Sequence, residues 1–305
     1  MLGEYSVLHG HGALIAAVEH RVLASFRAGG DALMMSSSLS TTPARVDSLD
    51  SGFGKAWAGV AAAGEWSGQR TPMYGALHID STALYDPTGR KLGFGSSAAV
   101  VVACAGATSQ KPLTVEAFAL LRDWHNRAQD STGSGGDVAA SLLGGLVWLE
   151  QGVPTRLPAA PPPLAVFKHA QAASTPSLTK QIRAFAGRAA HEYGALETRL
   201  VAAATRGRTA LKEADLASWV TACRDANAAL DELGQRAKVA IVNDAHRALV
   251  AKVEAAGGAC KPSGAGGGDL SLVTTPDEAT LQRLIDELGL ERVVVAATGL
   301  ETRIS

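Results

Sequence analysis

Length, composition and charge restrict the class of protein before any motif is considered. The chain has 305 residues, of which 47% are hydrophobic and 19% are charged, so it can bury a large core and we expect two lobes. With 28 basic against 29 acidic residues, the formal net charge is −1. This balance argues against nucleic acid or an anionic membrane surface as a partner, because both attract a strongly basic protein.

Cysteine usage and apolar runs predict a cytoplasmic protein. The cysteines Cys104, Cys223 and Cys260 are far apart and form no CxxC pair, which argues against a disulfide framework and favours a reducing compartment. The longest apolar run, 98–107, is too short to cross a bilayer. The first residues also lack the basic and then apolar pattern of a signal peptide.

The first half of the chain alternates strand-like segments, helical segments and glycine-rich loops. Patterns typical of strands occur at 13–18, 20–26, 76–81 and 143–149, and we expect the first two to pair with each other. The apolar segment 56–63 is too short to assign. Helical spacing of apolar residues predicts helices over 97–108 and 115–129.

The second half is mostly helical in its pattern. The proline-rich segment 157–164 can be neither helix nor central strand, so we place the lobe boundary there. Long amphipathic helices are expected at 178–207 and 215–256. The chain then continues through a strand at 270–273, a helix at 277–288 and a strand at 292–297.

The segment 91–99 (Lys-Leu-Gly-Phe-Gly-Ser-Ser-Ala-Ala) is the most informative loop. Its glycines allow positive φ, and a helix that begins at the serines would point its N–H groups and the positive end of its dipole at an anion. Ser96 or Ser97 could also cap this helix, and a hydroxyl there could reach a phosphate-bound Mg²⁺. An ordinary strand-to-helix turn with a serine cap explains the segment equally well on its own.

Two further glycine-rich loops, 131–140 and 261–269, also carry hydroxyl or acidic side chains. Together the loops suggest a large polyanion held on backbone amides, for which a nucleoside triphosphate is the natural candidate. No loop ends in the Gly-Lys-Ser/Thr of a P-loop. The segment 93–95 also lacks the third glycine of the dinucleotide fingerprint.

Three segments resemble the motifs of the GHMP kinases, the family of galactokinase, homoserine kinase, mevalonate kinase and phosphomevalonate kinase. The segment 3–8 (Gly-Glu-Tyr-Ser-Val-Leu) is similar to the first motif, 91–99 to the second and 261–269 (Lys-Pro-Ser-Gly-Ala-Gly-Gly-Gly-Asp) to the third. The third motif and the segment 128–139 are most similar to the phosphomevalonate kinase branch, although Asp130 stands where that branch has a glycine.

The resemblance implies a two-lobed α+β GHMP kinase fold. The first lobe, an ATP-binding domain over 1–157, would resemble the ribosomal S5 domain 2-like fold, and the second, over 158–305, a ferredoxin-like fold. In relatives a first strand ends in Gly-Lys-Leu shortly before the first motif. Since this sequence starts at Met1-Leu2, we expect that strand and its lysine, which lies near the substrate in relatives, to be missing from it.

The implied activity is phosphoryl transfer from ATP to 5-phosphomevalonate with Mg²⁺, in the mevalonate route to isoprenoids. Such transfer needs in-line placement and neutralisation of charge, whereas a strong base matters less because the acceptor phosphate is already ionised. Mevalonate kinase or another GHMP small-molecule kinase is an alternative. A GHMP homologue that binds nucleotide without catalysis is an alternative of another class.

Site residues are carried over from the resemblance. Asp137 would be the catalytic carboxylate, with a helix cap as its structural alternative, and Lys91 would bridge donor and acceptor phosphates, with a solvated loop lysine as its alternative. The residues implied to hold the ATP phosphates are Gly93, Gly95, Ser96, Ser97 and Ala98, with Ser97 contacting Mg²⁺. Those implied to face the acceptor are Ser134, Gly135, Lys261, Ser263, Gly264, Ala265, Gly266 and Gly267.

Two further positions bear on the site by resemblance. Many relatives supply a second metal contact, a glutamate, from the helix before the catalytic loop, and Asn126 stands there in this chain. An amide is a poor Mg²⁺ ligand, so we expect more water around the metal. The segment 173–175 resembles an Ala-Ser-Thr motif whose hydroxyls either contact the acceptor or cap a helix.

Overall fold

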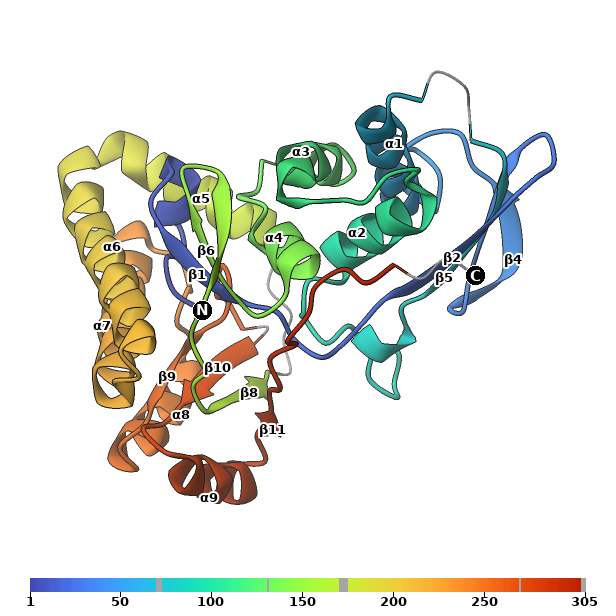
Figure 1. Cartoon of the computed structure of the whole chain (residues 1–305). Coiled ribbons are helices and arrows are strands. Elements are labelled where there is room, and N and C mark those ends of the chain that lie inside the picture. The colour runs from blue at the N-terminus through green and yellow to red at the C-terminus, as the bar shows by residue number, and fades with distance from the viewer. Residues whose placement is uncertain (70–72, 131, 170–174, 269, 303–305) are drawn as a thin grey trace. The chain divides into compact units, whose positions relative to one another are not determined.

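The computed structural model describes residues 1–69, 73–130, 132–169, 175–268 and 270–302 (Figure 1). The chain divides into two compact units, each of which packs mainly within itself. Unit 1 contains Met1–Ala16 and Trp148–Val295, and unit 2 contains Ala17–Val147 and Ala296–Ser305. Each unit is therefore assembled from segments that are distant in sequence. The sequence-based division into 1–157 and 158–305 cuts the chain only once, and it stays a prediction.

In the part of the chain that the structure describes, the strands form three sheets. One of them joins β1 (Ala13–Ala16), β6 (Leu146–Glu150) and β7 (Val153–Leu157) in the order β1-β6-β7. The predicted pairing of 13–18 with 20–26 is wrong, because β1 pairs with β6 and the second segment joins another sheet. An alternating pattern identifies a strand but not its partner, which is set by the packing of distant segments.

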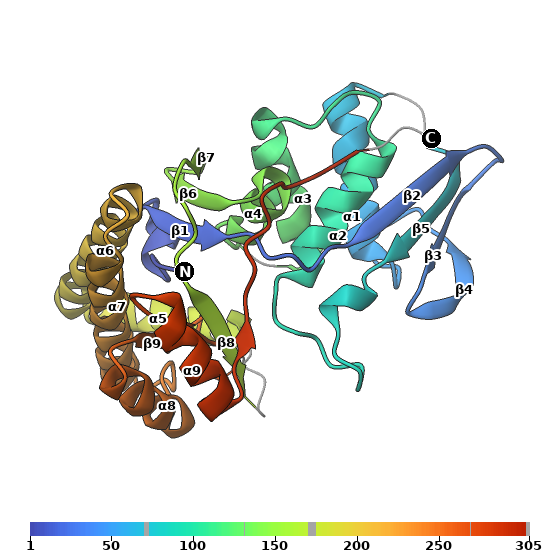
Figure 2. The same ribbon diagram turned by 60° about the horizontal axis from the view of Figure 1, so that its bottom comes forward.

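Unit 2 contains a mixed sheet in the order β2-β5-β3-β4. Its strands are β2 (Leu23–Ala28), β5 (Gly75–Asp80), β3 (Leu33–Ser37) and β4 (Ser40–Arg45). Along β5 buried and more exposed residues alternate, as its sequence predicts, so that Leu77 and Ile79 point into a core shared with Met35 and Val60. The helix α2 (Ser96–Thr108) packs on β2 and β5 (Figure 2).

The helices of unit 2 position its glycine-rich loops. They are α1 (Gly54–Ser67), α2, α3 (Phe118–Arg127) and α4 (Gly136–Leu143). A Cβ on Gly59 would lie 2.4 Å from the Val101 carbonyl oxygen, so only glycine allows α1 to approach α2 this closely. At the other end of both helices Ser67 Oγ lies 3.3 Å from Ser109 Oγ. The two helices therefore run in the same direction, and the first turn of α1 lies beside the first turn of α2.

Unit 1 contains an antiparallel sheet in the order β11-β8-β10-β9. Its strands are β11 (Glu291–Arg292), β8 (Leu164–Lys168), β10 (Leu270–Thr274) and β9 (Ala259–Pro262). All five residues of β10 are buried. Val273 of this strand packs in a core with Val253, Cys260 and Leu281, so the sheet is covered by helices rather than by solvent.

The helices of unit 1 are shorter than the sequence pattern predicts. They are α5 (Thr175–Arg188), α6 (Ala190–Lys212), α7 (Leu216–Ala237), α8 (Asp244–Ala255) and α9 (Glu278–Leu288). The predicted helix 215–256 is interrupted after Ala237, where Lys238 adopts the left-handed conformation with φ 58° and ends α7. Residues 243 and 277 then begin new helices as side-chain caps.

Taken over the described residues, the mixture of these helices and sheets confirms the α+β prediction. The ambiguous segment 56–63 is part of α1, and the predicted closing strand is limited to β11. Among the described residues, no helix combines the length and the apolar character that crossing a bilayer requires.

Candidate active site

The second motif forms a turn that leads directly into α2. Gly93 and Gly95 have φ of 83° and 73°, and Gly95 is the residue before the first helical turn. The N–H groups of Ala98 and Ala99 both donate to the Gly95 carbonyl, at 3.1 and 3.2 Å. The expectation that Ser96 or Ser97 caps the helix is wrong, because both residues lie inside its first turn and no side chain caps it. Their hydroxyls are thus available for other partners.

The loop that carries Asp137 reaches the second motif. Gly135, with φ 83°, precedes α4, and Asp137 is an acidic residue in the first turn of this helix, where burial raises the pKa of its carboxyl. The alternative role as a cap is therefore not fulfilled, although a carboxylate in the first turn is stabilised by the helix dipole. A Cβ on Gly95 would lie 3.0 Å from Asp137 Cγ and 3.1 Å from its Oδ2. The structure thus brings a carboxylate against the turn before α2.

Ser97 contacts a histidine that the sequence analysis did not select. His125 Nε2 of α3 lies 2.9 Å from Ser97 Oγ, and Gln129 lies within hydrogen-bond reach of both side chains. Only 8% of the His125 surface is exposed. Burial, together with the charge of Lys55, lowers the pKa of His125 to about 4, so the ring is neutral near pH 7.

Asn126, the next residue of α3, holds the loop before α4. Its Nδ2 donates to the Gly133 carbonyl at 3.2 Å, and its Oδ1 accepts from the Gly133 N–H at 3.0 Å. Both ends of the amide are therefore used to fix the loop. The expectation that more water surrounds the metal at this position stays a prediction.

Two lysines of unit 2 lie near these groups. Lys91 is exposed, and its backbone forms an isolated bridge with Tyr85. Lys55 is half-buried in the first turn of α1, where burial and then the charge of Lys91 lower its pKa. Because α1 and α2 run in the same direction, Lys55 stands beside the first turn of α2. Two cationic side chains thus accompany a helix N-terminus.

In unit 1 the first motif contacts the third. The Tyr5 hydroxyl donates to the Ala265 carbonyl at 2.6 Å, and the buried Lys261 ammonium contacts the Glu4 carboxylate and the Pro262 carbonyl. Only 1% of the Lys261 side chain is exposed. Lys261 therefore connects two motifs inside the unit instead of extending from a loop.

The backbone of the third motif is a tight glycine turn. Gly264, Gly266 and Gly267 have φ of 70°, 83° and 83°, and the Gly267 N–H donates to the Ile241 carbonyl at 2.9 Å. The Ser263 N–H donates to the Leu270 carbonyl at 2.9 Å, which closes the turn between β9 and β10. The last residue of the motif, Asp269, and the residues 173 and 174 lie outside the described part of the chain.

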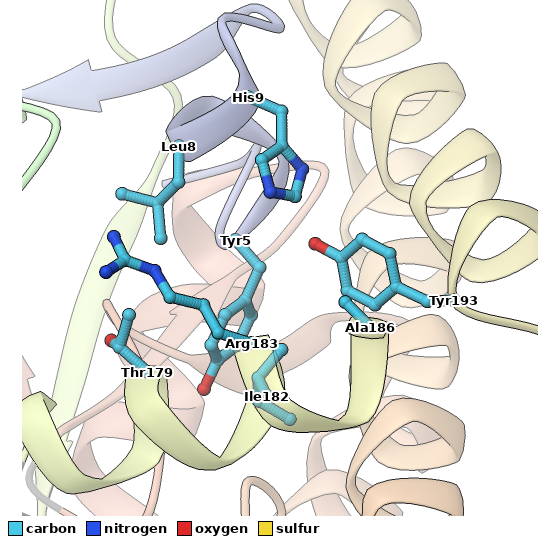
Figure 3. Close-up of a pocket in the computed structure, with 8 residues that line it drawn as sticks. All are labelled: Tyr5, Leu8, His9, Thr179, Ile182, Arg183, Ala186 and Tyr193. Atoms are coloured by element: carbon cyan, nitrogen blue, oxygen red, sulfur yellow. The ribbon is translucent and has the colours of Figure 1, made fainter. Parts of the chain in front are cut away.

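A small pocket in unit 1 lies next to the first motif (Figure 3). It is lined by Tyr5, Leu8 and His9 together with Thr179, Ile182, Arg183 and Ala186 of α5 and Tyr193 of α6. Figure 3 shows the aliphatic and aromatic side chains turned toward one another across it. None of the residues predicted for catalysis or phosphate binding lines this pocket, so it is distinct from the predicted site.

Comparison with known proteins identifies the family. A family model described as GHMP kinases N terminal domain matches residues 60–145. The phosphomevalonate kinase of Streptomyces sp. (strain CL190) is 31% identical over 256 residues, which cover 72% of this chain and 67% of that protein. The chain belongs to the GHMP kinase family. The resemblance inferred from three short motifs is thereby confirmed.

Solved structures share the fold of this GHMP kinase over nearly its whole length. The Lin0012 protein from Listeria innocua has a TM-score of 0.85 at 22% identity, covering 96% of this chain and 94% of that one. Streptococcus pneumoniae phosphomevalonate kinase in complex with phosphomevalonate and AMPPNP has a TM-score of 0.78 at 19% identity, covering 96% and 95%. Methanococcus jannaschii mevalonate kinase has a TM-score of 0.72 at 14% identity, covering 98% and 95%.

The loops of this GHMP kinase therefore form two described clusters. In unit 2, Gly93, Gly95, Ser96 and Ser97 lie with Asp137, and His125 and Lys55 are neighbours that sequence reasoning missed. In unit 1, the third motif lies with Glu4 and Tyr5 of the first. A lone histidine on an amphipathic helix has no sequence signal. Lys55 could have been found only after 56–63 was recognised as a helix.

Proposed function

We propose that this GHMP kinase transfers the γ-phosphoryl group of ATP to 5-phosphomevalonate in the cytoplasm, using Mg²⁺. The observation that carries the proposal is the contact of the Asp137 carboxylate with the turn before α2. It puts an acidic group beside a helix N-terminus suited to phosphates. The choice of acceptor is supported by the identity of 31% with a phosphomevalonate kinase.

In this proposal the first turn of α2 binds the ATP phosphates. The positive φ of Gly93 and Gly95 turns the backbone toward a bound anion, while Ser96 and Ser97 present hydroxyls there. Lys91, with Lys55 near it, supplies positive charge where negative charge gathers during transfer. Ala98 is buried and supports the turn from the helix side.

The residues of this turn also fit a magnesium ion held through phosphates. Across the residues that the structure describes, no group of three or more His, Cys, Asp or Glu side chains could hold a metal ion by itself. Mg²⁺ in kinases keeps several waters and is bound by substrate phosphates with only one or two protein groups. The Ser97 hydroxyl is the proposed protein contact, and the bound ion would neutralise charge on the phosphates.

In unit 2, Asp137 is proposed to orient the acceptor. An oxygen of the acceptor phosphate attacks the γ-phosphorus, the bond from this phosphorus to the β–γ bridging oxygen breaks, and ADP leaves. Asp137 with Ser134 and Gly135 would orient the attacking group. In unit 1 the Lys261 ammonium is bound to Glu4, so the backbone of 263–267, rather than this side chain, is the part of the third motif proposed to bind a phosphate group.

The first test is a measurement of ADP release with a panel of acceptors. The purified protein is supplied with MgATP and, in separate reactions, with phosphomevalonate, mevalonate, diphosphomevalonate, homoserine or galactose. We expect turnover with phosphomevalonate and its loss when EDTA is added. Faster turnover with mevalonate would identify the wrong acceptor. ATP binding in a calorimeter without product from any acceptor would identify a noncatalytic homologue.

The second test is the variant Asp137→Asn, which keeps the shape of the side chain and removes its charge. Because a carboxylate in an acid–base or orienting role contributes about 10²–10⁴-fold, we expect kcat to fall by at least ~10²-fold. Asp123→Asn is the matched control, since Asp123 is an exposed residue of α3 that pairs with Arg122. Equal kcat values for the two variants would contradict the role of Asp137.

A further inference from the structure

The last turn of α3 forms hydrogen bonds to both loops that the proposed reaction uses, the turn that leads into α2 and the loop before α4. His125 contacts Ser97 in the first turn of α2, and the adjacent Asn126 makes two hydrogen bonds to Gly133 in the loop before α4. Neither side chain has a part in the chemistry described so far. His125 and Asn126, consecutive residues of α3, thus fix the position of the first turn of α2 and of the loop that leads to Asp137.

The hydrogen bonds around Ser97 have a direction. Gln129 Nε2 lies 2.7 Å from His125 Nε2 and 3.3 Å from its Nδ1, which places it over the face of the ring and out of line with the lone pair of either nitrogen. In the tautomer that carries its hydrogen on Nδ1, His125 Nε2 is an acceptor. Ser97 Oγ lies 2.9 Å from the same ring nitrogen and 3.4 Å from Gln129 Oε1, which is also an acceptor. Whichever of the two acceptors takes it, the single proton of Ser97 points toward α3.

We propose that His125, assisted by Gln129, is a positioning residue that fixes Ser97 as a lone-pair donor to the magnesium ion of the bound nucleotide. This inference rests on the proposed function. A hydroxyl whose proton is directed into the protein presents both oxygen lone pairs on its other side, which is the orientation that a cation requires. A freely rotating hydroxyl would turn its proton toward the ion for part of the time and bind it less well.

Burial fixes the orientation of the His125 ring before the nucleotide binds. His125 is 8% exposed and is held on its other faces by the packing of α3 in unit 2, so the ring does not have to be ordered when the nucleotide binds. Groups that orient a metal contact in this way change metal affinity or activity by about 10–100-fold when they are removed.

The test is the affinity for AMPPNP, measured by calorimetry with Mg²⁺ and again with EDTA. The variant His125→Leu fills the space of the ring but accepts no hydrogen bond. We expect its affinity with Mg²⁺ to fall by about 10-fold or more, while its affinity in EDTA stays within about 2-fold of the wild type. His125→Gln, which offers an acceptor oxygen, should recover part of the loss.

A double-mutant cycle asks whether His125 acts through Ser97. In a Ser97→Ala background, His125→Leu should cause no further loss of Mg²⁺-dependent affinity. His78→Leu is the matched control, because His78 also contacts serine hydroxyls in unit 2, those of Ser36 at 2.9 Å and Ser38 at 3.2 Å. It should leave both affinities unchanged.

A further variant protects the test against misfolding. Gln129 is exposed, so Gln129→Met should fold normally and still reduce Mg²⁺-dependent binding by a few fold. Equal losses with and without Mg²⁺ in His125→Leu, or losses that add to that of Ser97→Ala, would overturn the inference. Magnesium-dependent binding that needs His125, without product from phosphomevalonate, would instead refute only the proposed acceptor.

Discussion

At the scale of single residues, the contact between Gly95 and Asp137 can be tested by adding one methyl group. Gly95→Ala would put a Cβ 3.0 Å from Asp137 Cγ, whereas Gly89, with a similar φ of 82°, has no atom within 4 Å of that position. Both alanines should lose about 1–2 kcal/mol of stability because of the left-handed backbone. Only Gly95→Ala should also displace the carboxylate and lower kcat, by about 10-fold or more.

The two variants are compared by urea unfolding and by steady-state kinetics. Similar losses of stability with a loss of kcat confined to Gly95→Ala would support the proposed site. A kcat for Gly89→Ala that fell as far as that of Gly95→Ala would show that backbone strain alone explains the effect.

The same residues show what sequence could predict of the site. The glycines of the second motif were recognised from local chemistry, namely positive φ and small side chains, whereas Asp137 was carried over from the resemblance to the GHMP kinases. His125 is 28 residues from Ser97, and nothing in the spacing of α3 distinguishes it from a core histidine. Lys261 was expected in an open loop, but its ion pair partner Glu4 is 257 residues away. Partners of this kind are determined by tertiary packing.

At the scale of elements, α8 depends on its cap. Asn243 has an extended backbone and its Oδ1 accepts from the His246 N–H at 2.8 Å, which satisfies one of the free donors of the first turn. Asn243→Ala should lower the free energy of unfolding by about 1 kcal/mol, measured in urea, and Asn243→Ser should retain most of it. No difference between the alanine and serine variants would show that the cap does not stabilise the unit.

Elements were predicted best where local pattern and packing agree. The helix expected over 97–108 begins one residue earlier, and β5 and β10 match their predicted segments closely. The predictions that failed concern where one helix ends and which strands pair with each other. The helix pattern continues through Lys238, where tertiary packing imposes a left-handed turn, and β1 pairs with a strand more than a hundred residues later. Intrinsic helix propensity is a local property, so it predicts neither the left-handed turn at Lys238 nor the pairing partner of β1.

At the scale of the whole molecule, the Glu4–Lys261 pair links the two ends of unit 1. Their side chains are 7% and 1% exposed, so removing one partner leaves an unpaired buried charge. Glu4→Gln and Lys261→Met should each lower the free energy of unfolding by about 3–5 kcal/mol. The double variant should lower it by clearly less than the sum of the two single losses. The measurement is a double-mutant cycle of unfolding free energies.

An exposed ion pair of the same unit is the control for this cycle. Arg206 Nη1 of α6 lies 2.9 Å from Asp225 Oδ2 of α7, and the two side chains are 47% and 46% exposed. Because solvent screens such a pair, Asp225→Asn should lower the free energy of unfolding by about 1 kcal/mol or less. Additive losses for Glu4→Gln and Lys261→Met would mean that the buried pair does not couple the first motif to β9.

The interleaving of the two units has a consequence for the synthesis of the protein. At about 5–20 residues per second, the ribosome makes Lys261 some 13–50 s after Glu4, a separation of 257 residues, so the first motif waits in solvent for its partner. Unit 2 is also completed late, because the Gly145 N–H donates to the Ala296 carbonyl at 2.7 Å. A nascent chain released ten residues early would contain all of unit 1 but would lack 296–305, so unit 2 would stay open and its exposed apolar segments would become substrates for chaperones and proteases.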